Sequence, residues 1–336
     1  KPSILAGFAN RCCAPPPMAS SGEGARDEPE KGGVVTQART CPWITVRVAL
    51  PREELRPFVT TYYYTEAQCS AREPLLEDYL HPKWPNLRFI HAQTCESAVG
   101  GEELRAVPFF AATGPTSRPA RFRMGSGQMW GIGLMPLGWA ALVEARAGDY
   151  ADRFVDALAD RAFSAFHPLA RALAQGEAGF APGLELIEQH MDRIVARSAA
   201  IGVLSGGPIR AVNAALVYPE IATVAQLAER VGMNVRSLER LTRRAFGFTP
   251  KLLLRRQRFL RSLAQFILDP SLKWLDALDC QYHDQAHFMR VVKWFMGMNP
   301  SEYARLDKPF LAPAARARME IAGEAVQGLH RPQGVA

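Results

Sequence analysis

The pattern of hydrophobic and polar residues changes character several times along the chain. Residues 1–40 mix Pro, Gly, Ser and alternating charges without a periodic apolar face, which predicts a disordered tail. Beyond residue 43, short runs rich in β-branched and aromatic residues alternate with Gly and Pro turns, as in antiparallel strands. We expect these strands at residues 44–50, 58–65, 87–91, 107–113 and 128–134.

Helical periodicity replaces strand alternation near Gly138. The spacing of apolar residues predicts amphipathic helices over 151–174 and 184–199, and Ser-Gly-Gly-Pro at 205–208 predicts a linker. Almost all of the chain from this linker to Tyr303 is predicted to be helical, and 311–336 is predicted to be a flexible tail.

The predicted fold class is therefore α+β. An N-terminal antiparallel β-rich, sensor-like domain with C-terminal helices (43–204) would serve effector binding or dimerisation. An all-α domain (208–306) would follow it.

An internal repeat at a spacing of 50 residues organises the all-α region. Gly247-Phe-Thr-Pro250 recurs as Gly297-Met-Asn-Pro300, and each copy closes a basic amphipathic helix with Gly followed by Pro. In the first copy, Thr223 and Gln226 form a capping-box pattern for a short preceding helix. Gly232 would make the turn and Asn234 would cap the second helix. Helix, glycine turn and basic helix are the layout of a helix-turn-helix.

One long helix is predicted between the two copies, over 251–268. It would join two tandem helix-turn-helix modules rigidly, so that they could address major-groove segments about one helical turn apart. The net charge supports this interpretation. The chain carries +7 overall, and residues 201–310 hold 16 Lys and Arg against 9 Asp and Glu, so the whole excess lies in this region.

Four segments carry a resemblance to a known family: 224–232 (VAQLAERVG), 238–241 (LERL), 284–290 (DQAHFMR) and 297–303 (GMNPSEY). Together they make residues 208–306 similar to the AraC/XylS-type DNA-binding domain. This resemblance implies a bacterial, sequence-specific transcriptional regulator with cytoplasmic location, which binds promoter DNA through two helix-turn-helix modules.

The resemblance assigns DNA-contacting roles to the two basic helices. Arginine there can bind guanine in a bidentate manner, glutamate can accept from cytosine, and glutamine can pair with adenine. The implied base contacts are Arg236, Glu239, Arg240, Gln285, Ala286 and Arg290. The expected phosphate contacts are Arg243, Arg244, Arg255, Arg256 and Lys293. On the first of these helices, Val235, Leu238 and Leu241 would pack inward.

Three positions depart from the family pattern. Thr242 stands where a Phe is usual, Gln281 stands where the second turn normally has Gly, and Asp276 occupies the position that Leu227 has in the first copy. A carboxylate in that core would be costly. The first module is therefore expected to contribute most of the sequence recognition.

The β-rich domain offers a candidate effector cavity. Its aromatic residues could line such a cavity or form an ordinary core: Tyr62, Tyr63, Tyr64, Trp84, Phe89, Phe109, Phe110 and Trp130. No catalytic residue, metal site or cofactor is predicted. His283 and His287 have a metal-compatible spacing but lack a third ligand.

The expected partner is double-stranded promoter DNA, with an unidentified small-molecule effector, RNA polymerase and a second copy of the chain as further candidates. No membrane partner or signal peptide is expected, because no apolar run reaches the length of a span. Two alternatives stay open at this point. One is a non-specific DNA-associated protein, and the other is a metal-dependent β-barrel enzyme with an accessory DNA-binding domain.

Overall fold

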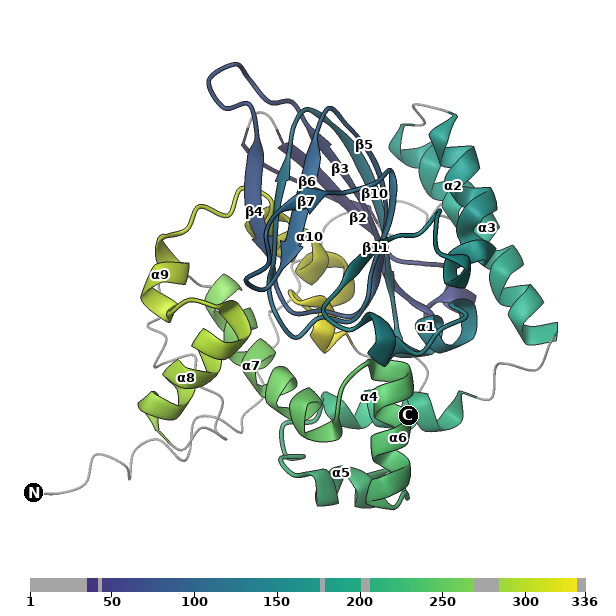
Figure 1. Cartoon of the computed structure of the whole chain (residues 1–336), viewed down its shortest axis with the longest axis vertical. Coiled ribbons are helices and arrows are strands. Elements are labelled where there is room, and N and C mark those ends of the chain that lie inside the picture. Colours follow the sequence, from purple (N-terminus) through teal and green to yellow (C-terminus); the bar gives the residue numbers. More distant parts are fainter. Residues whose placement is uncertain (1–34, 42–43, 176–178, 201–205, 269–283, 331–336) are drawn as a thin grey trace, which may run out of the picture.

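A computed structural model describes residues 35–41, 44–175, 179–200, 206–268 and 284–330 of the chain. Its N-terminal part is built on two antiparallel sheets that face each other (Figure 1). The larger sheet has the order β1 (Val35–Cys41), β2 (Ile44–Ala49), β3 (Val59–Ala67), β10 (Gly127–Leu134), β5 (Asn86–Ala92), β8 (Phe110–Thr113) and β11 (Phe154–Asp156). The smaller sheet has the order β4 (Leu76–Leu80), β9 (Ala120–Met124), β6 (Cys95–Val99) and β7 (Arg105–Ala106).

The predicted strands are confirmed at all five places, and the alternation of side chains decides which layer each residue joins. Tyr62 and Tyr64 on β3 pack on the helix-covered face of the large sheet, whereas Tyr63 packs between the sheets. The Tyr63 ring needs the absence of a side chain on its neighbour, since a Cβ at Gly131 would lie 1.9 Å from the ring.

The prediction of a disordered tail over residues 1–40 is wrong for its last residues. Residues 35–41 form β1, which pairs antiparallel with β2 from Val35 opposite Ala49 to Cys41 opposite Ile44. The neighbouring strand supplies the hydrogen-bond partners that the local sequence does not reveal. Residues 1–34 lie outside the described residues.

The predicted helix over 151–174 is also wrong for most of its length. Asp152 has φ +56°, β11 pairs with β8, and only α2 (His167–Ala174) is α-helical. The left-handed residue and the strand pairing break the helix before residue 167. By contrast, the helix predicted at 184–199 is confirmed as α3 (Phe180–Ala200).

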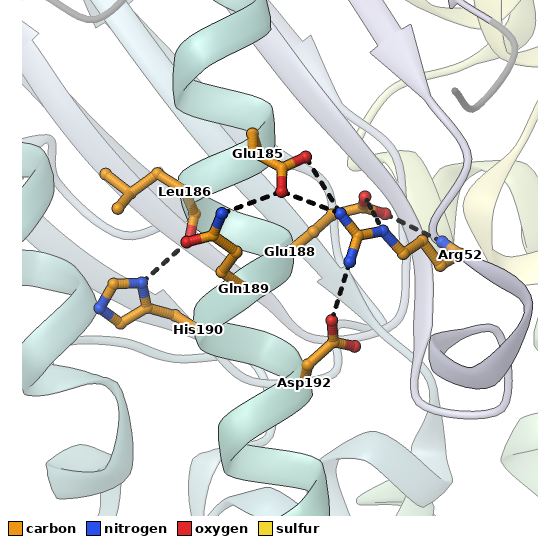
Figure 2. Close-up of polar contacts among 7 residues, drawn as sticks. All are labelled: Arg52, Glu185, Leu186, Glu188, Gln189, His190 and Asp192. Carbon is orange, nitrogen blue, oxygen red and sulfur yellow. Dashed lines mark hydrogen bonds and ion pairs between the residues drawn. The ribbon is translucent and has the colours of Figure 1, made fainter. Parts of the chain in front are cut away.

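Helices α2 and α3 cover the outer face of the large sheet, together with α1 (Pro136–Leu142) (Figure 1). Arg52 anchors α3 to the start of the β domain, as Figure 2 shows. Its guanidinium makes ion pairs of 3.0, 2.9 and 3.0 Å with Glu185, Glu188 and Asp192. Its backbone N–H also donates to Glu188 at 2.9 Å. Three carboxylates one helical turn apart thus hold the helix in register.

The helical region follows the predicted order. It contains α4 (Gly207–Leu216), α5 (Val224–Arg230), α6 (Val235–Phe246), α7 (Pro250–Leu268), α8 (Gln285–Met296) and α9 (Pro300–Arg305). The long helix predicted at 251–268 is confirmed as α7. Residues 269–283, with Asp276, Gln281 and His283, lie outside the described residues.

The predicted C-terminal flexible tail is wrong. Residues 311–322 form α10 (Leu311–Ala322), and a 3-10 helix, η5 (Gln327–Leu329), follows it. Figure 1 shows α10, in yellow, returning from the helical region to the β domain, where it lies against β1 and β2. The buried carboxylate of Asp78 accepts the N–H groups of Phe310 and Leu311 at 2.9 and 2.8 Å.

This C-terminal segment belongs to two cores at once. Phe310 and Ala317 are buried between the sheets, while Ala325, Val326 and Leu329 are buried against α7 and α8. Many of the apolar residues of this segment are small alanines, and their burial depends on the surface that receives them, which the local sequence does not show. Within the described part of the chain, no helix is long and apolar enough to cross a bilayer.

Candidate DNA-binding surface

The first helix-turn-helix is formed by α5 and α6, with the capping that the sequence predicts. The Thr223 hydroxyl accepts the Gln226 N–H at 3.2 Å, and Gln226 Oε1 accepts the Thr223 N–H at 3.0 Å. Gly232 takes φ +64° in the turn, and Asn234 Oδ1 accepts the Ser237 N–H at 2.8 Å to begin α6. These local contacts satisfy helix-end amides that would otherwise have no partner.

Helix α6 separates buried and exposed faces sharply. Its buried side chains are Leu238, Thr242, Ala245 and Phe246, and the buried Thr242 hydroxyl donates to the Glu239 carbonyl at 3.2 Å. Val235 was expected to pack inward, yet it is 44% exposed. The proposed contact residues of this helix are all exposed: Arg236, Glu239, Arg240, Arg243 and Arg244.

The second basic helix, α8, has the same division. Asp284 caps it through the His287 N–H at 2.6 Å, and Gly297 ends it at φ +71°. Its buried side chains are Phe288, Val291, Val292, Phe295 and Met296. Gln285, Ala286, Arg290 and Lys293 are exposed on the other side. Among the described residues, no three side chains that could ligate a metal come together.

Arg256 is a correction to the expected phosphate contacts. Its side chain is 0% exposed and its guanidinium carbon lies 3.9 Å from the centre of the Trp84 ring. Its Nη1 donates to the carbonyls of Lys83 and Thr116 at 3.4 and 3.2 Å. Burial lowers the pKa of Arg256 to about 9, and nearby Asp152 opposes that shift. A side chain held in this way cannot reach DNA. Its neighbour Arg255 is half-buried, 5.3 Å from the Trp294 ring centre.

The β domain thus provides a seat for α7, formed by residues 83–84 and 113–118. Asp152 shapes this seat, because its carboxylate accepts the Ser117 N–H, the Ser117 hydroxyl and the Arg118 N–H at 2.5, 2.7 and 3.2 Å. Trp84 reaches from the seat into the core of the first module, edge-on to Phe246 at 5.8 Å between ring centres.

The C-terminal ends of both basic helices, α6 and α8, contact this same seat. A Cβ at Gly247, the residue that closes α6, would lie 2.4 Å from Pro115 Cγ. At the end of α8, the Arg118 guanidinium stacks on Trp294 at 4.0 Å and donates to the Trp294 carbonyl. The seat therefore holds the C-terminal ends of α6 and α8, whereas Arg236 and Gln285, near their N-terminal ends, are exposed.

A groove of about 1620 Å³ lies beside α6, between it and the β domain. Its α6 wall includes Arg240, Arg243 and Arg244, and its other wall includes Arg193 and Arg197 of α3. Of the proposed base contacts on α6, Arg240 lines the groove, whereas Arg236 does not. The excess of arginine on both walls makes the groove attractive to an anionic polymer.

The aromatic residues expected around an effector cavity are mostly core. Of the eight, only Tyr63 lines the cavity between the sheets. Tyr62, Tyr64, Phe89, Phe110 and Trp130 pack under the helices on the opposite face, and Phe109 packs against that core. Trp84 was expected only in a cavity or an ordinary core, and Arg118 and Asp152 were not expected in any site. Nothing in the local sequence pattern shows that these residues lie against helices more than 90 residues away.

The described residues contain one complete helix-turn-helix, α5 and α6, and a second capped basic helix, α8, which is the layout of a DNA-binding region of the helix-turn-helix class. Comparison with protein-family models agrees, since residues 227–306 match a model described as a helix-turn-helix domain. This segment is an AraC-type helix-turn-helix domain, as the resemblance implied.

Comparison with solved structures finds similar chains at low identity. ToxT from Vibrio cholerae matches with 10% identity and a TM-score of 0.37, over 69% of this chain and 98% of that chain. The AraC-like transcriptional activator CuxR matches with 14% identity and a TM-score of 0.28, over 66% and 82%. No curated protein matches the chain.

Proposed function

We propose that this protein is a sequence-specific transcriptional regulator that contacts promoter bases with the exposed N-terminal halves of α6 and α8. The observation that supports this most is the exposure of Arg236, Glu239 and Arg240 on a helix whose opposite face buries Leu238, Thr242, Ala245 and Phe246. Helix-turn-helix proteins contact base edges mainly with the N-terminal residues of the second helix. Gln285, Ala286 and Arg290 would contact bases from α8 in the same way.

Phosphate contacts would come from Arg243, Arg244, Arg255 and Lys293. These side chains are exposed or half-buried near the proposed base contacts. Residues 208–306 would act as the DNA-binding domain. The β-rich domain, whose sheets also hold α10, would sense an effector or mediate dimerisation. RNA polymerase and a second copy of the chain are the proposed protein partners.

The first test is selection of bound duplexes from a random DNA library at about 150 mM salt. The proposal expects an enriched motif, and two blocks about one helical turn apart would assign base contacts to both modules. Salt-sensitive binding without enrichment would instead indicate a non-specific DNA-associated protein.

Arg236→Ala and Arg240→Ala then test the contact residues. Each variant should lose about 1–3 kcal/mol of discrimination at one base pair. The two positions differ in one respect, because Arg240 lines the groove beside the β domain and Arg236 does not. A loss with Arg236→Ala alone would mean that the β domain keeps DNA out of the groove. Unchanged preferences in both variants would refute the assignment.

A further inference from the structure

A cavity of about 120 Å³ lies between the two sheets, beneath the C-terminal segment. Its apolar lining comes from both sheets and includes Val46, Ile90 and Phe122. Phe310 and Ala314 close it from the C-terminal side. An engineered protein cavity of about 150 Å³ binds benzene, so this space suits a molecule with a body of that size.

Three cationic side chains line this apolar cavity: Lys83, Arg88 and Arg318. Lys83 and Arg88 are only 8% and 9% exposed. No Asp or Glu belongs to the lining, and none of the three cations has an ion pair in the described part of the chain. Burial and the neighbouring guanidiniums of Arg88 and Arg318 lower the pKa of the Lys83 ammonium.

The hydrogen bonding of Arg88 is incomplete. Nη1 of Arg88 donates to the Thr113 hydroxyl at 2.7 Å, and Nη1 of Arg318 donates to the Thr61 hydroxyl at 2.7 Å. Nη2 of Arg88 is buried without a partner among the described residues. A buried charge without a counter-charge is strongly unfavourable, so this arrangement calls for an anion.

The neutral polar groups of the cavity do not share this deficit. Asn86 Nδ2 donates to Gln327 Oε1 at 2.9 Å, and Gln327 Nε2 donates to the Thr60 hydroxyl at 3.0 Å. The cavity therefore lacks a negative charge opposite its cations and does not lack partners for its neutral polar groups. A neutral ligand or a water molecule would leave the excess positive charge uncompensated.

We propose that the cavity binds a small organic acid. Its carboxylate would lie among Lys83, Arg88 and Arg318, and its apolar body would pack on Ile90 and Phe122. Arginine and lysine form charge-assisted hydrogen bonds with carboxylates. The volume limits the body to about the size of a benzene ring.

The position of Arg318 couples this site to the helix-turn-helix modules. Arg318 lies on α10, which follows α9 and lies beyond the family match at 227–306. Lys83 and Arg88 belong to the β domain. A carboxylate shared by these side chains ties the C-terminal segment to the β domain. Only this regulatory consequence rests on the proposed function; binding of the acid does not.

The test is binding of benzoate to the full-length protein without DNA, measured by calorimetry and by thermal unfolding. Benzoate should bind and raise the unfolding temperature. Benzamide has nearly the same shape without the charge, and inorganic phosphate has charge without the ring; both should bind at least tenfold more weakly. Equal binding of benzoate and benzamide, or no binding of benzoate, would overturn the proposal.

Lys83→Met and Arg318→Met test the cations separately, so that failure of one variant to fold leaves the other. Each should weaken benzoate binding tenfold or more, because a hydrogen bond to a charged group is lost. Arg121→Met is the matched control. Arg121 precedes Phe122 on β9 but is not part of the cavity lining, so binding should be unchanged. Benzoate affinity equal to wild type in both cavity variants would refute the site.

Random-library selection without benzoate keeps the two proposals apart. An enriched DNA motif without benzoate binding would refute the acid site and leave the regulator intact. Benzoate binding that depends on Lys83 and Arg318, without any DNA enrichment, would support the site and refute the proposed function.

Discussion

Arg255 and Arg256 are adjacent on α7, and the structure predicts opposite consequences of changing them. Arg256 is fully buried on Trp84 and donates to two carbonyls of the β domain, whereas Arg255 is half-buried near Trp294. Arg256→Ala should therefore destabilise the protein and leave the salt dependence of DNA binding unchanged. Arg255→Ala should leave the stability close to wild type and reduce the salt dependence of DNA binding.

The magnitude follows from what truncation at Arg256 removes. A desolvated cation–π contact contributes about 2 kcal/mol, and the lost stem of the side chain about 0.8 kcal/mol per buried CH₂. Release of the cost of burying a guanidinium offsets part of this. We expect a net loss of about 2–3 kcal/mol for Arg256→Ala. Arg256→Met keeps the packing and should stay within about 1 kcal/mol of wild type.

The assay combines urea unfolding with DNA affinity measured from about 50 to 200 mM salt. Loss of one phosphate contact lowers the slope of log K against log salt by about 0.9. If Arg256→Ala lowers this slope while its unfolding midpoint matches wild type, Arg256 contacts phosphate and is not held by the β domain. Arg256→Met is the control for packing, because a phosphate contact would be lost equally in both Arg256 variants.

Three further predictions concern the contacts that hold the fold together. Burial raises the pKa of Asp78 from 3.8 to about 6, so its contribution to stability is present below about pH 4 and is lost as the pH rises through 6. It amounts to about 3 kcal/mol. The difference in unfolding temperature between wild type and Asp78→Asn should follow this course, and a constant difference from pH 4 to 7 would contradict it. Arg52→Met should cost about 1 kcal/mol at low salt and less in 1 M NaCl, in contrast to the exposed control Arg72→Met. Deletion of residues 310–336 should expose the cores of the second module and of the sheets and cause aggregation. A soluble 310–336 deletion with native stability would refute the packing of α10.

Features whose partners are close in sequence could be predicted from the local pattern of residues. The capping box at Thr223, the turn at Gly232, the cap at Asn234 and the closing Gly247 and Gly297 all lie where the sequence predicts them. Each of these contacts joins residues two to four positions apart, so the local sequence contains both partners. The five predicted strands are local features too, because each is a short run rich in β-branched and aromatic residues between turn residues.

Features whose partners are distant in sequence appear only once the chain has folded. Arg256 is buried because Lys83 and Thr116 offer carbonyls 173 and 140 residues away, and a basic residue on a basic helix carries no sign of that contact. The segment after Phe310 becomes α10 because Asp78, 232 residues away, accepts its first N–H groups. Lys83, Arg88 and Arg318 line one cavity only because the β domain and the C-terminal segment pack against each other. Burial and charge balance are properties of the assembled surfaces, and no local pattern contains them.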